Sequence, residues 1–276
     1  MFLMARKQTL QSSDRAMGLR DWITAILGPG SRSDGSGADQ QITRWQKALS
    51  DFGFPYDLVS GANADEALAS GKILGRQNGF APVVIAPGHW NSVRIAADER
   101  AKHAREILQR TDLTAASGRQ FLADRLLSEC PDLDEFENLK AKDSRIASRG
   151  LLTVKRPTAK EGATWDEVAI VRVPAASPEE LAVYLWWGGW NFAPSPEMIV
   201  AVARYWKETY GSELVGMGSD LLEFHASRKP PDHASAIALL KEHYAFAPDG
   251  FEFYVPFLED AAAYLRANSS WGFWWD

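Results

Sequence analysis

Hydrophobic and polar positions follow two periods along this chain, one typical of helices and one typical of strands. Apolar residues recur every three or four positions at 42–53 and again around 96–147, which predicts helices. A continuous apolar run at 83–85 and an alternating one at 165–175 predict strands, the first of them buried on both faces. We therefore expect an α+β or α/β fold, with a mixed β-sheet flanked by helices and a helical segment around 96–147.

The last third of the chain carries clear signals for where elements begin. Ser177 and Ser195 are each followed by a proline, which predicts two capped helices, and a glutamate three residues after Ser177 completes a capping box. The stretch "SELVGMGSDLLEFHA" predicts two strands joined by a turn at 218–220. Further helices are expected after Asp232 and over 257–270.

Glycine and serine are concentrated at 28–41, which predicts a flexible linker. Ahead of it, "LRDWITAILG" has the pattern of a short amphipathic helix. We therefore divide the chain into an N-terminal helix with its linker, residues 1–38, and a globular domain, residues 39–276.

Composition and charge exclude several classes of function. The net charge of −6 argues against nucleic-acid binding, which relies on clustered Lys and Arg, and against anionic membrane surfaces. The single cysteine, Cys130, cannot form an internal disulfide. No apolar run approaches the roughly 20 residues that a membrane span needs, and the N-terminal residues lack the order of a secretory signal. We therefore expect a cytoplasmic protein.

The sequence contains no complete catalytic or cofactor motif. The pair Gly71–Lys72 lacks the other residues of a phosphate-binding loop, and no dinucleotide fingerprint or nucleophile elbow is found. The five histidines show no pair at metal-ligand spacing on a helix. We expect no metal and no cofactor, and whether the chain is an enzyme stays open.

Two short stretches carry side chains able to transfer protons. In "SDLLEFHA", Glu223 and His225 share one face of a predicted strand, and Asp220 lies in the turn before it. In "YAFAPDG", Asp249 lies between Pro and Gly, which is also a turn signature. Each stretch has a structural interpretation as well: a solvated strand face for the first and a turn aspartate for the second. These four residues are the catalytic candidates.

Tryptophan is concentrated near the C terminus. Seven of the eleven tryptophans lie after residue 185, and the chain ends in "SSWGFWWD". Because each indole buries about 150–250 Å² when gathered, we expect the last six residues to add as a strand or pack as a plug against the "WWGGWN" loop. The gathered rings form either core or the walls of a pocket. In the second case the binding residues are Trp187, Trp190, Asn191, Trp271, Trp274 and Trp275.

Four stretches match a known pattern in order and spacing: "VRVPAASPEELAVYLWWGGWNFAPSPE", "VAVARYWKETYGSELVGMGSDLLEF", "LLKEHYAFAPDG" and "WGFWWD". On these residues the segment at 164–276, most clearly about 171–276, resembles the bacterial domain of unknown function numbered 4253. Members of that family commonly have cysteines where this chain has Ala193 and Ala247. Their joint replacement implies that the two positions are neighbours in space. The resemblance implies fold and boundaries, and it implies no activity.

Two classes of function, and as a third a largely structural or scaffold role, are consistent with these observations. The lack of a complete catalytic motif, the negative charge and the tethered N-terminal helix favour a non-catalytic protein-binding module, such as an immunity protein, with a protein partner. The alternative is a small-molecule enzyme with an aromatic-walled pocket and Asp, Glu and His as acid–base residues. Two candidate side chains within hydrogen-bonding distance of each other would favour the enzyme. The oligomeric state stays open.

Overall fold

In the computed structural model, the described residues are 36–88, 96–110, 113–129, 153, 164–248 and 258–275. The helix predicted at 19–28, Cys130 and Asp249 lie outside these ranges. None of the helices in the described ranges combines the length and hydrophobicity that crossing a membrane requires.

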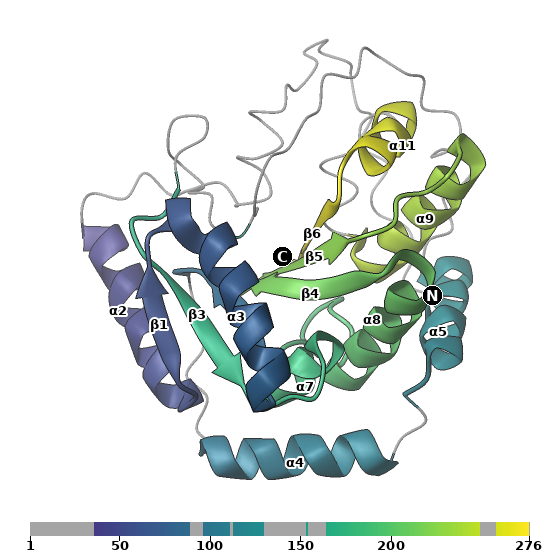
Figure 1. Ribbon diagram of the computed structural model, residues 1–276. Helices are drawn as coiled ribbons and strands as arrows, with labels where there is room; N and C mark the ends of the chain where they lie inside the picture. Colours follow the sequence, from purple (N-terminus) through teal and green to yellow (C-terminus); the bar gives the residue numbers. More distant parts are fainter. Residues whose placement is uncertain are drawn as a thin grey trace, which may run out of the picture.

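A six-stranded mixed sheet forms the centre of the molecule (Figure 1). Its strands lie in the order β1 (Tyr56–Val59), β3 (Val168–Val173), β2 (Ala81–Ile85), β4 (Ser212–Met217), β5 (Leu221–Ala226) and β6 (Ser270–Trp274). Neighbouring strands are antiparallel except β2 and β4, which are parallel. The predicted fold class, a mixed sheet flanked by helices, is confirmed.

Helices cover both faces of this sheet. Helix α3 (Ala64–Asn78) follows the short turn η1 (Gly61–Asn63) and crosses the front of the sheet in Figure 1. The larger core on the opposite face includes side chains from α2 (Ser36–Phe52), α4 (Ala97–Arg110), α5 (Ala115–Glu129), α7 (Leu181–Leu185), α8 (Pro196–Tyr210), α9 (His233–Phe246) and α11 (Leu258–Ala267). Helices α4 and α5 confirm the predicted helical segment over its described part.

Strand β2 shows why the sheet needs a layer on each side. All five of its residues are buried. Val83 and Ile85 pack into the larger core, whereas Val84 between them packs into the smaller core under α3. Successive side chains of a strand point to opposite faces, so an uninterrupted apolar run requires apolar cover on both. The predicted burial on both faces is confirmed.

Two predicted helix starts are confirmed with their capping hydrogen bonds, whereas the capping box predicted at Ser177 is wrong. Ser195 accepts a hydrogen bond from the Met198 N–H, and Asp232 caps α9 in the same way. Ser177 makes no capping hydrogen bond; the segment opens as a 3₁₀ turn, η2 (Pro178–Glu180), before α7. The tighter winding of a 3₁₀ turn brings different N–H groups within reach. The Glu180 carboxylate accepts a hydrogen bond from the Ala176 N–H.

The predicted linker at 28–41 extends too far toward the C terminus. Helix α2 already begins at Ser36, ahead of the start expected at Ile42. The Gly and Ser residues of this stretch end at Gly37, and the residues after it are compatible with a helix.

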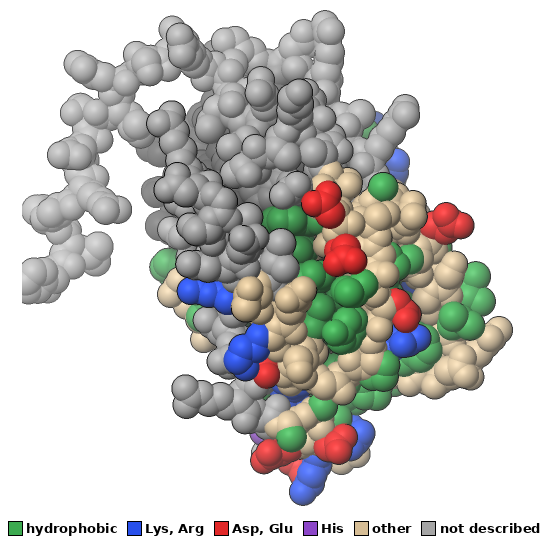
Figure 2. Space-filling model, turned by 90° about the vertical axis from the view of Figure 1, so that its left-hand side faces the viewer, with side chains coloured by type: hydrophobic (Ala, Val, Ile, Leu, Met, Phe, Trp, Pro, Cys, Tyr) green, Lys and Arg blue, Asp and Glu red, His purple; other side chains and the backbone are tan. Residues whose placement is uncertain are grey.

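The β1 edge of the sheet exposes apolar side chains. Tyr56 and Leu58 on β1 are 39% and 47% exposed, and Ile73 and Leu74 on α3 are also exposed. Figure 2 looks at the side of the molecule where α2 and β1 lie, and hydrophobic side chains gather there between acidic and basic ones. This edge is therefore a mixed apolar and charged surface.

Candidate functional site

The C-terminal strand completes the aromatic core. Strand β6 pairs with β5, so that Trp271 lies opposite Phe224. Trp275, directly after β6, is fully buried, and its ring centroid lies 5.1 Å from that of Trp187. The predicted strand addition and the predicted packing against the "WWGGWN" loop are both confirmed.

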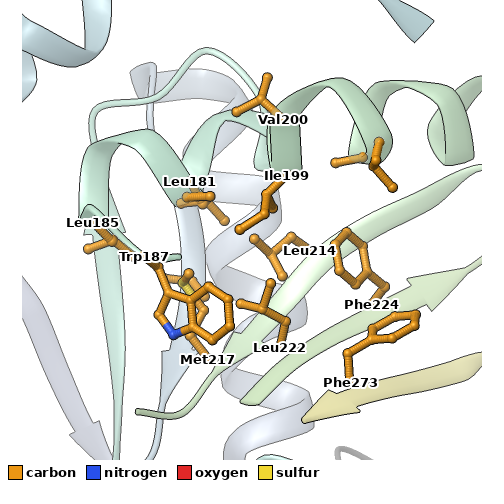
Figure 3. Close-up of a cluster of buried hydrophobic side chains, with 14 of the residues drawn as sticks. Leu181, Leu185, Trp187, Ile199, Val200, Leu214, Met217, Leu222, Phe224 and Phe273 are labelled. Atoms are coloured by element: carbon orange, nitrogen blue, oxygen red, sulfur yellow. The ribbon is translucent and has the colours of Figure 1, made fainter. Parts of the chain in front are cut away.

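Most of the C-terminal tryptophans fill this core. Trp187, Trp206, Trp271 and Trp275 are each 2% exposed or less. Figure 3 shows Trp187 among apolar side chains from α7, α8 and the sheet, and its Nε1 donates a hydrogen bond to the Gly218 carbonyl oxygen at 2.8 Å. A ligand could not touch these four rings unless the core opened.

The loop after α7 has an unusual backbone. Trp186 and Asn191, with φ of 54° and 45°, are the non-glycine residues of positive φ in the described ranges. Gly188 and Gly189 between them have φ of 112° and 81°. Non-glycine residues in such conformations cost about 1–3 kcal/mol each, persist only where the surroundings hold them, and cluster at functional sites.

Hydrogen bonds hold this loop in place. Within it, the Gly189 N–H donates to the carbonyl oxygen of Pro194 at 2.9 Å. From outside, Arg125 of α5 donates from Nη2 to the Phe192 carbonyl oxygen at 2.6 Å. Gly188 has no room for a side chain, because a Cβ there would lie 2.4 Å from the carbonyl oxygen of Pro194. The backbone of the loop is therefore fixed in one shape.

Two aromatic side chains of the loop stay exposed. Trp186 is 38% exposed and Phe192 is 56% exposed, while Trp190 is half-buried. The Trp186 ring lies 5.3 Å from the ring of His103 on α4. We define Trp186, Trp190 and Phe192 as the aromatic loop surface. Of the predicted binding residues, it contains Trp190 and lies beside Asn191, which is exposed.

A second group of side chains lies on the other face of β5. Glu223 is fully buried, and its Oε2 accepts hydrogen bonds from the backbone N–H and the hydroxyl of Thr153, at 2.8 and 2.6 Å. Its Oε1 lies 3.4 Å from His225 Nε2, which lies 2.9 Å from Ser270 Oγ. We call Glu223, His225, Ser270 and Thr153 the Glu–His group. The predicted solvated face is wrong for Glu223, because Thr153 covers it.

Two glycines leave the space that Glu223 occupies. Gly216 on β4 and Gly272 on β6 are its neighbours in the sheet register. A Cβ at Gly216 would lie 2.1 Å from Thr153 Oγ1 and 3.2 Å from Glu223 Oε2. The register of β4 shifts just before Gly216, as at a β-bulge. The sequence contains both glycines, but it does not show that both are neighbours of Glu223.

Of the two remaining catalytic candidates, Asp220 does not join the Glu–His group. Asp220 Oδ2 accepts a hydrogen bond from Trp274 Nε1 at 3.0 Å, and the Asp220 carbonyl oxygen accepts one from the Trp275 N–H at 3.1 Å. Asp220 therefore anchors the C-terminal strand. Asp249 lies outside the described residues. Within the described ranges, no three side chains are arranged to hold a metal ion.

A hollow of about 580 Å³ lies where the end of α2, the end of α3 and α4 meet. Its lining includes the apolar Phe54 and Phe80 and the cationic Arg105 and Arg172. None of its lining residues belongs to the aromatic loop surface or to the Glu–His group.

Comparison with known proteins assigns part of the chain. A family model described as "Domain of unknown function (DUF4253)" matches residues 169–276, from β3 to the C terminus. A search of the curated proteins and a search of the solved structures each found no match. The matched segment contains the whole aromatic loop surface and the Glu–His group except Thr153. Residues 169–276 of this chain are therefore a DUF4253 domain, which confirms the family resemblance of its sequence.

Proposed function

We propose that this protein is a binding module that recognises a protein partner through the aromatic loop surface. The observation that carries this proposal is a fixed, strained loop backbone that keeps Trp186 and Phe192 exposed. Trp186 is also the residue that ends α7 in the left-handed conformation, as is common at helix ends, so the support for the proposal lies in the exposed rings that the held backbone presents.

The energetics of protein interfaces support this function. Tryptophan is enriched among the few residues that contribute most of the binding energy of an interface. A loop that is already rigid loses little conformational entropy on binding, which favours affinity. The buried tryptophans contribute indirectly, since they form the base on which the loop rests.

The chemistry of the partner is constrained by the surface and the charge. The chain carries a net charge of −6, so long-range attraction favours a basic partner. The exposed rings require an apolar recess on that partner. We therefore expect a protein with an apolar recess and a basic rim; neutralisation of an antagonistic protein, as by an immunity protein, is one form of such binding.

Paired variants of the exposed rings test the proposal. The full chain is cross-linked and purified from its native host, and the affinity of each captured protein is then measured against Trp186→Ser, Phe192→Ser and the control Leu127→Ser. Leu127 is 82% exposed on α5 and lies outside the loop. The loop variants should weaken binding about 30-fold or more, as for hot-spot residues, and the control should not. A partner whose affinity is the same for all three variants contradicts the proposal.

A further inference from the structure

We propose that the Glu–His group is a proton-transfer site, in which His225 Nδ1 is the general base and Glu223 is the positioning residue. The proposal is independent of the binding function of the aromatic loop surface. It rests on the positions of four side chains from three separate stretches of the chain.

The contacts of the imidazole ring select one tautomer. His225 Nε2 lies 3.4 Å from Glu223 Oε1 and 2.9 Å from Ser270 Oγ. An ionised carboxylate only accepts hydrogen bonds, so this arrangement is favourable when the proton is on Nε2. In the neutral ring Nδ1 then carries the lone pair. Within the described ranges, no hydrogen bond to Nδ1 is found.

This arrangement differs from a Ser–His–acid triad. In a triad the serine and the carboxylate contact opposite nitrogens of the ring, so that the histidine can take the serine proton. Here Ser270 and Glu223 both approach Nε2. Ser270 is therefore a second anchor for the ring, and the oxygen to be activated comes from outside the protein.

Glu223 is held firmly in position. It is fully buried, its Oε2 accepts two hydrogen bonds from Thr153, and glycines flank it on both neighbouring strands. A charge at this depth acts through a lower effective dielectric than one in water. It therefore stabilises the imidazolium that forms when Nδ1 accepts a proton.

The surroundings of His225 leave it reachable. Its side chain is 29% exposed, and Glu213 lies opposite it on β4. Burial alone would raise the pKa of Glu213, but hydrogen bonds from Lys207 and Lys72 lower it to about 2. The neighbouring charges are thus paired with one another, and the proposal requires that the exposed part of the ring includes Nδ1.

The chemistry available is proton abstraction from an O–H group. The substrate class is water or a small molecule with a hydroxyl group. The O–H bond breaks, its electron pair stays on the oxygen, and the proton forms a new N–H bond at Nδ1. The Nε2 proton stays in place beside Glu223.

The tautomer of His225 is the direct test of the positioning role of Glu223, because it shows which ring nitrogen keeps the lone pair. Two-bond ¹H–¹⁵N spectra of the ¹⁵N-histidine-labelled full chain, at a pH where the ring is neutral, report which nitrogen carries the proton. The expected wild-type result is the Nε2–H form, retained in Ser270→Ala and replaced by a mixture of tautomers in Glu223→Gln. The Nδ1–H form or an even mixture in the wild type would overturn the proposal, whether or not Glu223→Gln folds.

Acylation by diethyl pyrocarbonate tests whether Nδ1 can be reached. This reagent modifies unprotonated imidazole nitrogens, and mass spectrometry locates the product. His233 is exposed at the start of α9 and serves as the internal reference. His225 should react at a rate within about tenfold of His233, in proportion to its exposure. If His233 reacts and His225 stays protected, the base is inaccessible and the proposal fails.

Discussion

At the residue scale, the aromatic core contains a titratable ring whose Nε2 no hydrogen bond satisfies. His243 is buried among Trp206, Trp271 and Phe273, with ring centroids 4.8 to 5.2 Å away. Its Nε2 has no hydrogen-bond partner, and burial lowers the pKa of the ring to about 3. The imidazole is therefore neutral in the folded protein, where it acts as a flat apolar ring.

We predict that His243 makes the protein less stable in acid. Between pH 6.5 and 3 the unfolded chain binds a proton that the folded chain does not, so the free energy of unfolding falls as pH falls, by about 1.4 kcal/mol per unit. His243→Leu removes this contribution. From pH 7 to pH 5, the wild type should lose about 2 kcal/mol more than the variant in urea unfolding. A difference between the two proteins that stays constant with pH would contradict the prediction.

At the scale of elements, β6 is an edge strand of five residues, stabilised by its own tryptophans and by the indole directly after it. The Trp275 indole packs under the loop after α7. The Trp271 indole packs in the core between α8 and α9. Trp274, between them, points to the other face and contacts Asp220. Neighbouring tryptophans in the same short segment therefore differ in burial.

This difference gives a matched pair of variants. Trp275→Ala leaves a cavity in the core and should lower the free energy of unfolding by about 3–5 kcal/mol. Trp274→Ala removes a partly exposed ring and a hydrogen bond, and should cost about 1–2 kcal/mol. Urea unfolding of both variants measures the difference. Equal losses would mean that Trp275 does not belong to the core.

At the scale of the whole molecule, one sheet joins the two halves of the chain. Strand β2 comes from the N-terminal half and lies between β3 and β4, both of which include residues of the DUF4253 domain. The matched segment therefore lacks a central strand of its own sheet. Without β2, the buried edges of β3 and β4 would have no hydrogen-bond partners there.

We predict that residues 164–276 do not fold alone. The fragment should lack a cooperative urea transition and a defined near-UV circular dichroism spectrum, because the central strand and the helices before β3 are missing. A chain of residues 36–276 is the control and should unfold like the full protein. Cooperative unfolding of the short fragment would show that the DUF4253 segment is an independent unit.

The elements of this protein were predictable from sequence wherever a local signal sets them. The apolar run of β2, the Ser–Pro start of α8 and the alternation of β5 are each contained in a few consecutive residues. The first residues of α2 and α7 were not predictable in this way. Helices that begin a few residues apart differ little in free energy, and composition and capping motifs do not separate them.

The sequence by itself determined most helices and strands, the fold class and the inward packing of most C-terminal tryptophans, because hydrophobic periodicity and the burial of apolar rings follow from the order of residues along the chain. Only the tertiary structure decided that these rings fill a core, and that Glu223 is buried beside His225. Thr153 is 70 positions from Glu223, and Ser270 is 45 positions from His225. Contacts at that separation depend on strand order and register, which no local pattern encodes.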